Sequence, residues 1–212
     1  MLMNKEEKFV ITISRQFGTG GHEIGAELAR RLNVKLLDKQ ILNEMARRFN
    51  IVEEAVEKIE ARNPLWRDDF TQFYRSYMAK AEYSGQEHDE TSRQLFEAQA
   101  EVIRKIANQE SCVIVGRCAN YILRGRDNVL NVFVTAPVAD CVRRVMEVDG
   151  LDLEEAEKKI RKIDKRRADY YKYFTGRQWQ DAALYDLCLN TGHMSDEKCV
   201  ALVKAYMDAR FE

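Results

Sequence analysis

Three glycines stand within four residues near the start of the chain, at positions 18, 20 and 21. They follow an apolar, β-branched run at residues 9–14, and apolar residues then recur at helical spacing at Ile24, Leu28 and Leu32. Closely spaced glycines between a strand and a helix let backbone N–H groups converge on an anion, and the helix N-terminus adds about half a positive charge. The segment therefore predicts a phosphate-binding loop, with a tight strand-to-helix turn that holds no ligand as the simpler alternative.

This loop departs from the common phosphate-binding motif at the positions that carry charge. The motif, the Walker A loop, is G-x-x-x-x-G-K-[ST], and the matching window here is Arg15-Gln-Phe-Gly-Thr-Gly-Gly-His22. Arg15 stands at the position of the first glycine, Gly21 at that of the lysine, and His22 at that of the hydroxyl that binds magnesium. A cation for a bound phosphate must therefore come from another position.

Arg117 is the first such candidate. It follows a buried apolar strand expected at residues 112–116, and ligands of open α/β sheets bind at the carboxyl ends of the strands. A guanidinium at that point can grip a phosphate with two hydrogen bonds. A surface arginine paired with a carboxylate is the alternative interpretation.

A second group of cations lies on a helix that we expect to begin after Asp152, a good N-cap residue. The apolar face of this helix is formed by Leu153, Ala156, Ile160 and Ile163, and the same period places Arg167 where an apolar residue is expected. Arg167 is therefore predicted to point into a cleft, and we expect Asp164 and Asp169 to orient the bases around it. The basic run comprises Arg161, Lys165, Arg166 and Arg167, and a solvated helix face is its alternative interpretation.

The elements that must position these residues alternate between strands and helices. Strands are expected at residues 9–14, 34–37, 112–116, 129–134 and 185–189, with helices between most of them. This order predicts an α/β fold with a parallel sheet covered by helices on both faces. A long helical insertion is expected at residues 53–110, with a polar loop at 83–91 and a helix at 92–108.

Composition excludes several classes of protein. The chain has 212 residues, of which 45% are hydrophobic and 33% charged, and its net charge is -1, so no overall field attracts it to nucleic acid or to an anionic membrane. No stretch reaches the roughly 20 apolar residues of a membrane span, and the polar N-terminus does not resemble a signal peptide, so we expect a cytoplasmic protein. The five cysteines lack the spacing of a zinc site and are expected to be reduced and mostly buried.

Four segments together resemble the cytidylate kinase-like family, a divergent branch of the P-loop nucleoside monophosphate kinases. They are Ile13-Ser-Arg-Gln-Phe-Gly-Thr-Gly-Gly-His-Glu-Ile-Gly25, Leu37-Asp-Lys-Gln-Ile-Leu42, Val113-Ile-Val-Gly-Arg-Cys-Ala-Asn-Tyr-Ile-Leu123 and Tyr185-Asp-Leu-Cys-Leu-Asn-Thr191. The resemblance covers nearly the whole chain. It implies a single P-loop kinase domain over residues 1–212, with a three-layer α/β/α core around five parallel strands. It also implies that residues 53–110 cover a monophosphate site and that residues 152–180 form a lid.

The resemblance further implies which residues meet the nucleotides. ATP, with Mg2+, would bind the glycine loop through Arg15, Gly18, Thr19, Gly20, Gly21, His22 and Glu23. The monophosphate acceptor, CMP or dCMP by the family name, would contact Asp38, Lys39, Arg117, Arg161 and Lys165. Arg117, Arg166, Arg167, Lys39 and His22 would act in phosphoryl transfer. Cys118 stands where orthodox cytidylate kinases have the aspartate of a Gly-Arg-Asp motif that helps to recognise the acceptor.

For the missing lysine we hypothesise that His22, Arg15 or Lys39 takes its place beside the phosphates. Magnesium would then be held by phosphate oxygens, water and Asp38 or Thr19. The main alternative function is a degenerate kinase fold that binds a nucleotide or phosphate without transferring it. A third reading is an interaction domain for nucleic acid or protein that uses the basic run 161–167, which the neutral net charge disfavours. The insertion could instead support a homodimer.

Overall fold

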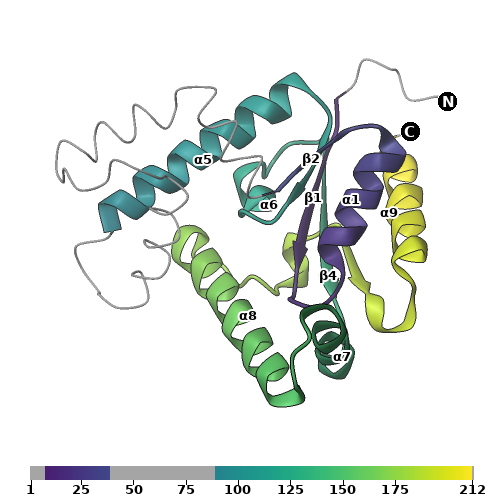
Figure 1. The fold of residues 1–212 in the computed structure, drawn as a ribbon. Coiled ribbons are helices and arrows are strands. Elements are labelled where there is room, and N and C mark those ends of the chain that lie inside the picture. Colours follow the sequence, from purple (N-terminus) through teal and green to yellow (C-terminus); the bar gives the residue numbers. More distant parts are fainter. Residues whose placement is uncertain (1–7, 39–88, 212) are drawn as a thin grey trace. The chain divides into compact units, whose positions relative to one another are not determined.

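The computed structural model describes residues 8–38 and 89–211 (Figure 1). The chain divides into two compact units, residues 39–105 and the remainder, which holds the sheet. Helix α5 (Asp89–Gln109) begins three residues before the helix expected at 92–108, so the polar tract 83–91 ends inside it. Lys39 and most of the expected insertion 53–110 lie outside the described residues.

Five parallel strands form the sheet, as predicted. They are β1 (Val10–Arg15), β2 (Lys35–Leu37), β3 (Cys112–Val115), β4 (Val129–Thr135) and β5 (Leu187–Asn190), in the order β2-β3-β1-β4-β5. Strand β5 begins two residues later than expected, and the backbone N–H of Asp186, just before it, donates to the carbonyl of Asn131 in β4 at 2.8 Å. Since all strands run the same way, Arg15 and Gly116 both lie at the carboxyl edge of the sheet.

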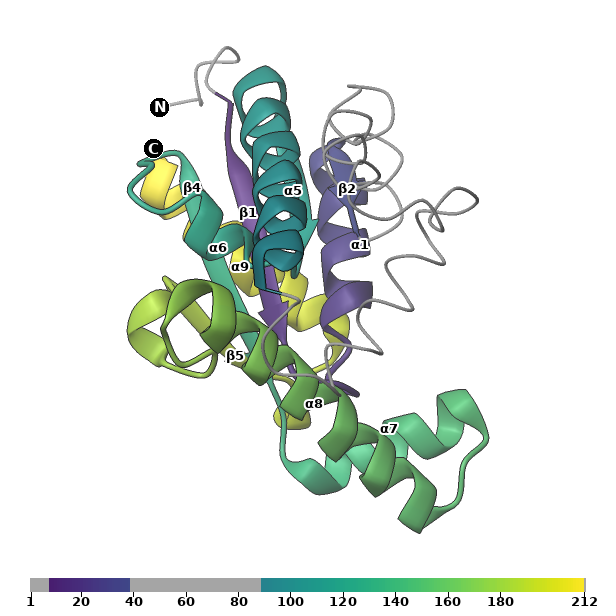
Figure 2. The same cartoon turned by 90° about the vertical axis from the view of Figure 1, so that its left-hand side faces the viewer.

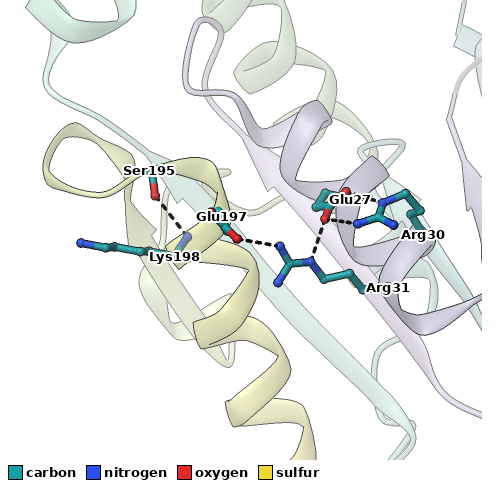
Figure 3. Close-up of polar contacts among 6 residues, drawn as sticks. All are labelled: Glu27, Arg30, Arg31, Ser195, Glu197 and Lys198. Carbon is teal, nitrogen blue, oxygen red and sulfur yellow. Dashed lines mark hydrogen bonds and ion pairs between the residues drawn. The ribbon is translucent and has the colours of Figure 1, made fainter.

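One face of the sheet is covered by α1 (Gly21–Leu32) and α9 (Asp196–Phe211), which lie side by side in Figures 1 and 2. Ile24 and Leu28 of α1 and Val203 of α9 are fully buried in one apolar cluster with alternate residues of β1, β3 and β4. At the surface Glu27 pairs with Arg30 and Arg31, and Arg31 reaches Glu197 of α9 at 3.4 Å (Figure 3).

The other face carries α6 (Ala119–Ile122) and the segment 176–186, which contains a 3-10 turn at Ala182–Leu184. Phe133 of β4 packs edge-on against Trp179, with ring centroids 5.5 Å apart, and against Tyr185 at 4.9 Å. Trp179 is therefore buried in the core. The sheet lies between two helical layers, which is the expected three-layer α/β/α fold.

Helices α7 (Val138–Asp149) and α8 (Leu153–Thr175) pack against each other beyond the carboxyl edge of the sheet (Figure 1). Asp152 caps α8 as predicted: its carboxylate accepts a bond from the Glu155 N–H at 2.9 Å, and the Glu155 side chain bonds back. Ala156 and Ile160 are buried, but Leu153 is 57% exposed rather than part of the apolar face. As the first residue of the helix, it lines the open groove between α7 and α8 instead.

All five cysteines are free thiols, and all except Cys188 are buried, which confirms the prediction of reduced, mostly internal cysteines. In the part of the chain that the structure describes, no helix is both long enough and apolar enough to cross a bilayer.

Replacing Asp152 by alanine removes the cap that starts α8, so we expect a loss of about 1 kcal/mol in the free energy of unfolding. The control is Lys158→Ala, on the exposed face of the same helix, with a change below about 0.5 kcal/mol. Urea unfolding of both variants measures the difference. Equal values in the two variants would show that the cap does not hold α8.

Candidate functional site

The glycine loop connects β1 to α1 and needs glycine at two places. Gly18 and Gly20 have φ angles of 82° and 77°, in the left-handed region that side chains disfavour. A Cβ atom on Gly18 would also lie 2.8 Å from the carbonyl oxygen of Cys141 in α7. The two glycines therefore let the loop make its turn against α7, as expected of a loop that presents its backbone to a ligand.

Hydrogen bonds fix the loop from three sides. The Thr19 hydroxyl, which is buried, donates to the carbonyl of Gln16 at 2.9 Å, and the Thr191 hydroxyl donates to the carbonyl of Thr19 at 2.9 Å. The backbone N–H of Phe17 donates to Asp164 of α8 at 2.8 Å. The loop is therefore preorganised, and the Thr19 hydroxyl is engaged within it.

Arg15, the last residue of β1, carries a mostly buried guanidinium. A Cβ atom added to Gly116, at the end of β3, would lie 2.3 Å from its Nη1 atom, so the side chain runs along the sheet edge from β1 to β3. Burial, Arg167 and Arg117, in that order, lower the pKa of Arg15 to about 9. Among the described residues no carboxylate forms an ion pair with Arg15. The Asp164 and Glu23 carboxylates act on it through space and raise its pKa, but they offset the lowering only in part.

Arg167 of α8 points toward the loop, as its position in the helical period predicted. Its Nη1 atom donates to the carbonyl of Arg15 at 2.9 Å and lies 3.4 Å from Asp164, while its guanidinium lies 5.6 Å from the Phe17 ring centre. Burial lowers the pKa of Arg167 and raises that of Asp164. Asp164 thus orients Arg167, as we expected, and joins it to the loop backbone.

Arg117 leaves β3 through an unusual turn. Gly116, Arg117 and Cys118 have φ angles of 81°, 61° and 54°, so three consecutive residues adopt the left-handed conformation. For the two residues with side chains this is strained, and such strain is found where the surroundings enforce it, often at functional sites. Burial raises the pKa of the Cys118 thiol to about 12, so the thiol stays neutral. The resemblance stated above implies an aspartate at this position in orthodox cytidylate kinases.

Arg144 of α7 is a residue that sequence reasoning missed. A Cβ atom on Gly20 would lie 2.2 Å from its Nη1 atom, so its guanidinium lies directly over the glycine loop. Asp196 at the start of α9 binds it at 2.5 and 3.1 Å and raises its pKa. The helical spacing gave no signal for it, because this contact depends on how α7 and α9 meet at the loop.

Asn120 of α6 forms a further buried contact between elements. Its Nδ2 atom donates to the Tyr171 hydroxyl of α8 at 3.0 Å, while its Oδ1 atom has no hydrogen-bond partner among the described residues. Burial raises the pKa of Tyr171 to about 12, so its hydroxyl stays protonated. This contact attaches the carboxyl half of α8 to the turn that carries Arg117.

The other candidates are mostly exposed, although the Glu23 carboxylate raises the pKa of Arg15 and of Arg144 through space. Arg161 and Lys165 are 69% and 76% exposed and pair with Glu157 and Asp169 on their own helix. Arg166, His22 and Glu23 are exposed, and Asp38 is partly buried directly after β2. Within residues 8–38 and 89–211 no group of three His, Cys, Asp or Glu side chains could hold a metal ion.

Comparison with known proteins decides the family. The sequence model of the cytidylate kinase-like family matches residues 10–193, from the first residue of β1 to the turn after β5. The chain belongs to this family. It is 26% identical to a cytidylate kinase of Pyrococcus horikoshii over 96% of this chain and 90% of that protein. It is 31% identical to the cytidylate kinase of Thermococcus kodakarensis over 57% of this chain, a match that spans only 60% of that relative.

A solved structure matches the fold of this chain over nearly its whole length. An uncharacterised protein from Eubacterium ventriosum superimposes with a TM-score of 0.71 and 30% identity, over 96% of this chain and 99% of that one. The cytidylate kinase-like assignment confirms the resemblance inferred from the four sequence segments. The five-stranded parallel core confirms the expected P-loop kinase type of fold.

Replacing Asp164 by alanine leaves the Phe17 N–H without its partner and Arg167 without its carboxylate. We expect the free energy of unfolding to fall by about 1–3 kcal/mol. Asp169→Ala on the same helix removes only an exposed ion pair and should change it by less than about 0.5 kcal/mol. Urea unfolding tests both variants, and similar losses would mean that Asp164 does not anchor the loop.

Replacing Arg15 by glutamine removes a buried charge that two other arginines repel. In buffer without phosphate we expect the melting temperature to rise by about 2–4 °C, as for a gain of roughly 1 kcal/mol in a chain of this size. Arg30→Gln, at an exposed arginine paired with Glu27 (Figure 3), is the control and should give no rise. A lower melting temperature for Arg15→Gln would contradict the repulsion.

Proposed function

We propose that this chain is an ATP-dependent nucleoside monophosphate kinase that transfers the γ-phosphoryl group of ATP to CMP or dCMP. The observation that carries the proposal is the group of Arg15, Arg117 and Arg167 near the carboxyl edge of the sheet, beside the glycine loop. Arg167 donates a hydrogen bond to the Arg15 carbonyl, and both Arg167 and Arg117 are close enough to lower the pKa of Arg15. Family membership and the names of the relatives support a phosphotransferase.

The reaction needs positioning and charge more than covalent chemistry. An oxygen of the acceptor phosphate attacks the γ-phosphorus in line, the bond to the β-γ bridging oxygen breaks, and ADP leaves with that electron pair. Loop N–H groups would bind the ATP phosphates, and the three guanidiniums would stabilise charge on the transferred group and the acceptor. Mg2+ would supply further neutralisation, held mainly by phosphate oxygens and water, since His22 replaces the usual hydroxyl.

The acceptor base is the part of the proposal that rests on family names alone. The aspartate expected to recognise it is replaced by Cys118, whose thiol is buried and neutral. Base recognition would then come from other groups, and a panel of acceptors is needed to identify the substrate.

A coupled assay of ADP formation with ATP, Mg2+ and CMP, dCMP, UMP, AMP or GMP tests the function. We expect turnover with a cytidine monophosphate, and a loss of about 100-fold or more in kcat/KM for Arg117→Ala and Arg167→Ala. Arg143→Ala, at an exposed arginine of α7 paired with Asp140, is the matched control and should stay within about twofold of the wild type.

The second candidate, a degenerate binding module, is favoured by Gly21 and His22, which lack the charge and the hydroxyl of a Walker A loop. It predicts that nucleotides raise the melting temperature of the wild type while no acceptor in the panel gives turnover. That outcome would replace the kinase proposal.

A further inference from the structure

Residues 15 and 21 compete for one volume at the base of the glycine loop. A Cβ atom added to Gly21 would lie 2.6 Å from the Cβ atom of Arg15 and 2.9 Å from its Cγ atom. The Cβ atom of Arg15 is fixed by the backbone, so it cannot move aside as the end of a flexible side chain could. A side chain at position 21 and one at position 15 therefore exclude each other.

The same geometry shows where the charge of Arg15 lies. From the point above Gly21 the side chain continues to Gly116, which has no side chain and leaves room for the guanidinium. Arg117 and Arg167 approach it from β3 and α8, and no carboxylate of the described residues forms an ion pair with it. Asp164 pairs with Arg167 and, with Glu23, acts on Arg15 only through space, so the Arg15 guanidinium has no carboxylate in contact with it among the described residues and is suited to bind an anion.

We propose that Arg15 supplies the cation for the ATP phosphates that a lysine at position 21 supplies in a Walker A loop. The inference rests on the proposed function and deepens it. Compared with the Walker A motif, the charged residue and the glycine have changed places. Arginine stands at the position of the first glycine, and glycine stands at the position of the lysine. The charge enters the site from the end of β1 instead of the start of α1.

The structure favours Arg15 over His22 for this role, while Lys39 lies outside the described residues. The side chain of His22 is exposed on the first turn of α1, whereas Arg15 lies at the carboxyl edge between the loop and β3. A guanidinium can also bind two phosphate oxygens at once through its planar fork of N–H groups. The ammonium group of a lysine acts on a phosphate only as a point charge.

The steric part of the inference is tested by four variants without any ligand. Gly21→Lys alone should lower the melting temperature by about 5 °C or more, because it overpacks the loop. The double variant Arg15→Gly with Gly21→Lys should recover most of that loss. The double variant Arg15→Ala with Gly21→Lys keeps the Cβ atom that clashes and should not recover it. Arg15→Gly alone gives the reference for the glycine at position 15.

The chemical part is tested by calorimetric titration of ATP. Arg15→Gln should weaken ATP binding by about 30-fold or more, the effect of removing one partner of a buried charge pair. Arg15→Lys should stay within about tenfold of the wild type, and so should the double variant Arg15→Gly with Gly21→Lys. The surface control Arg30→Gln should bind ATP like the wild type.

The outcomes separate this inference from the kinase proposal. Unchanged melting temperature in Gly21→Lys, or wild-type ATP affinity in Arg15→Gln, overturns the role of Arg15 even if the enzyme turns over. If Arg15→Gln loses ATP and the exchanged double variant regains it, the inference holds, even where no monophosphate in the panel is phosphorylated.

Discussion

The repulsion among guanidiniums at the carboxyl edge of the sheet is the constraint around which the site is organised. Arg15 is mostly buried, Arg167 and Arg117 lower its pKa, and the Asp164 and Glu23 carboxylates offset this only in part. Buried charge without an ion-pair partner lowers stability, so the fold must hold the Arg15 side chain in place by other means. It does so with glycines that make room for this side chain and with the hydrogen bond that the Arg15 carbonyl accepts from Arg167.

Helix α8 connects this charge to the rest of the molecule. Its amino end begins at the Asp152 cap, its middle carries Asp164 and Arg167, and its carboxyl half reaches α6 through Tyr171. Because Asp164 binds both the loop backbone and Arg167, a displacement of α8 would change the loop and the cation together.

The sequence predicted the elements whose signals are local. All five strands follow from short, mostly apolar runs, the start of α8 follows from Asp152, and the inward direction of Arg167 follows from the helical period. It did not predict Arg144 over Gly20, because that contact is made between α7 and the loop and depends on tertiary packing. Nor did it predict the left-handed backbone of Arg117 and Cys118, since neither residue type favours that conformation.

The 2.6 Å approach between the side-chain positions of residues 15 and 21 also restricts how such loops can change over time. A lysine at position 21 clashes with the Cβ atom of an arginine at position 15, so adding the new cation first lowers stability. A path of single substitutions that avoids this clash passes through a loop with small residues at both positions and neither cation. The two forms are therefore separated by an intermediate of low phosphate affinity, and each should persist within its own lineage once established.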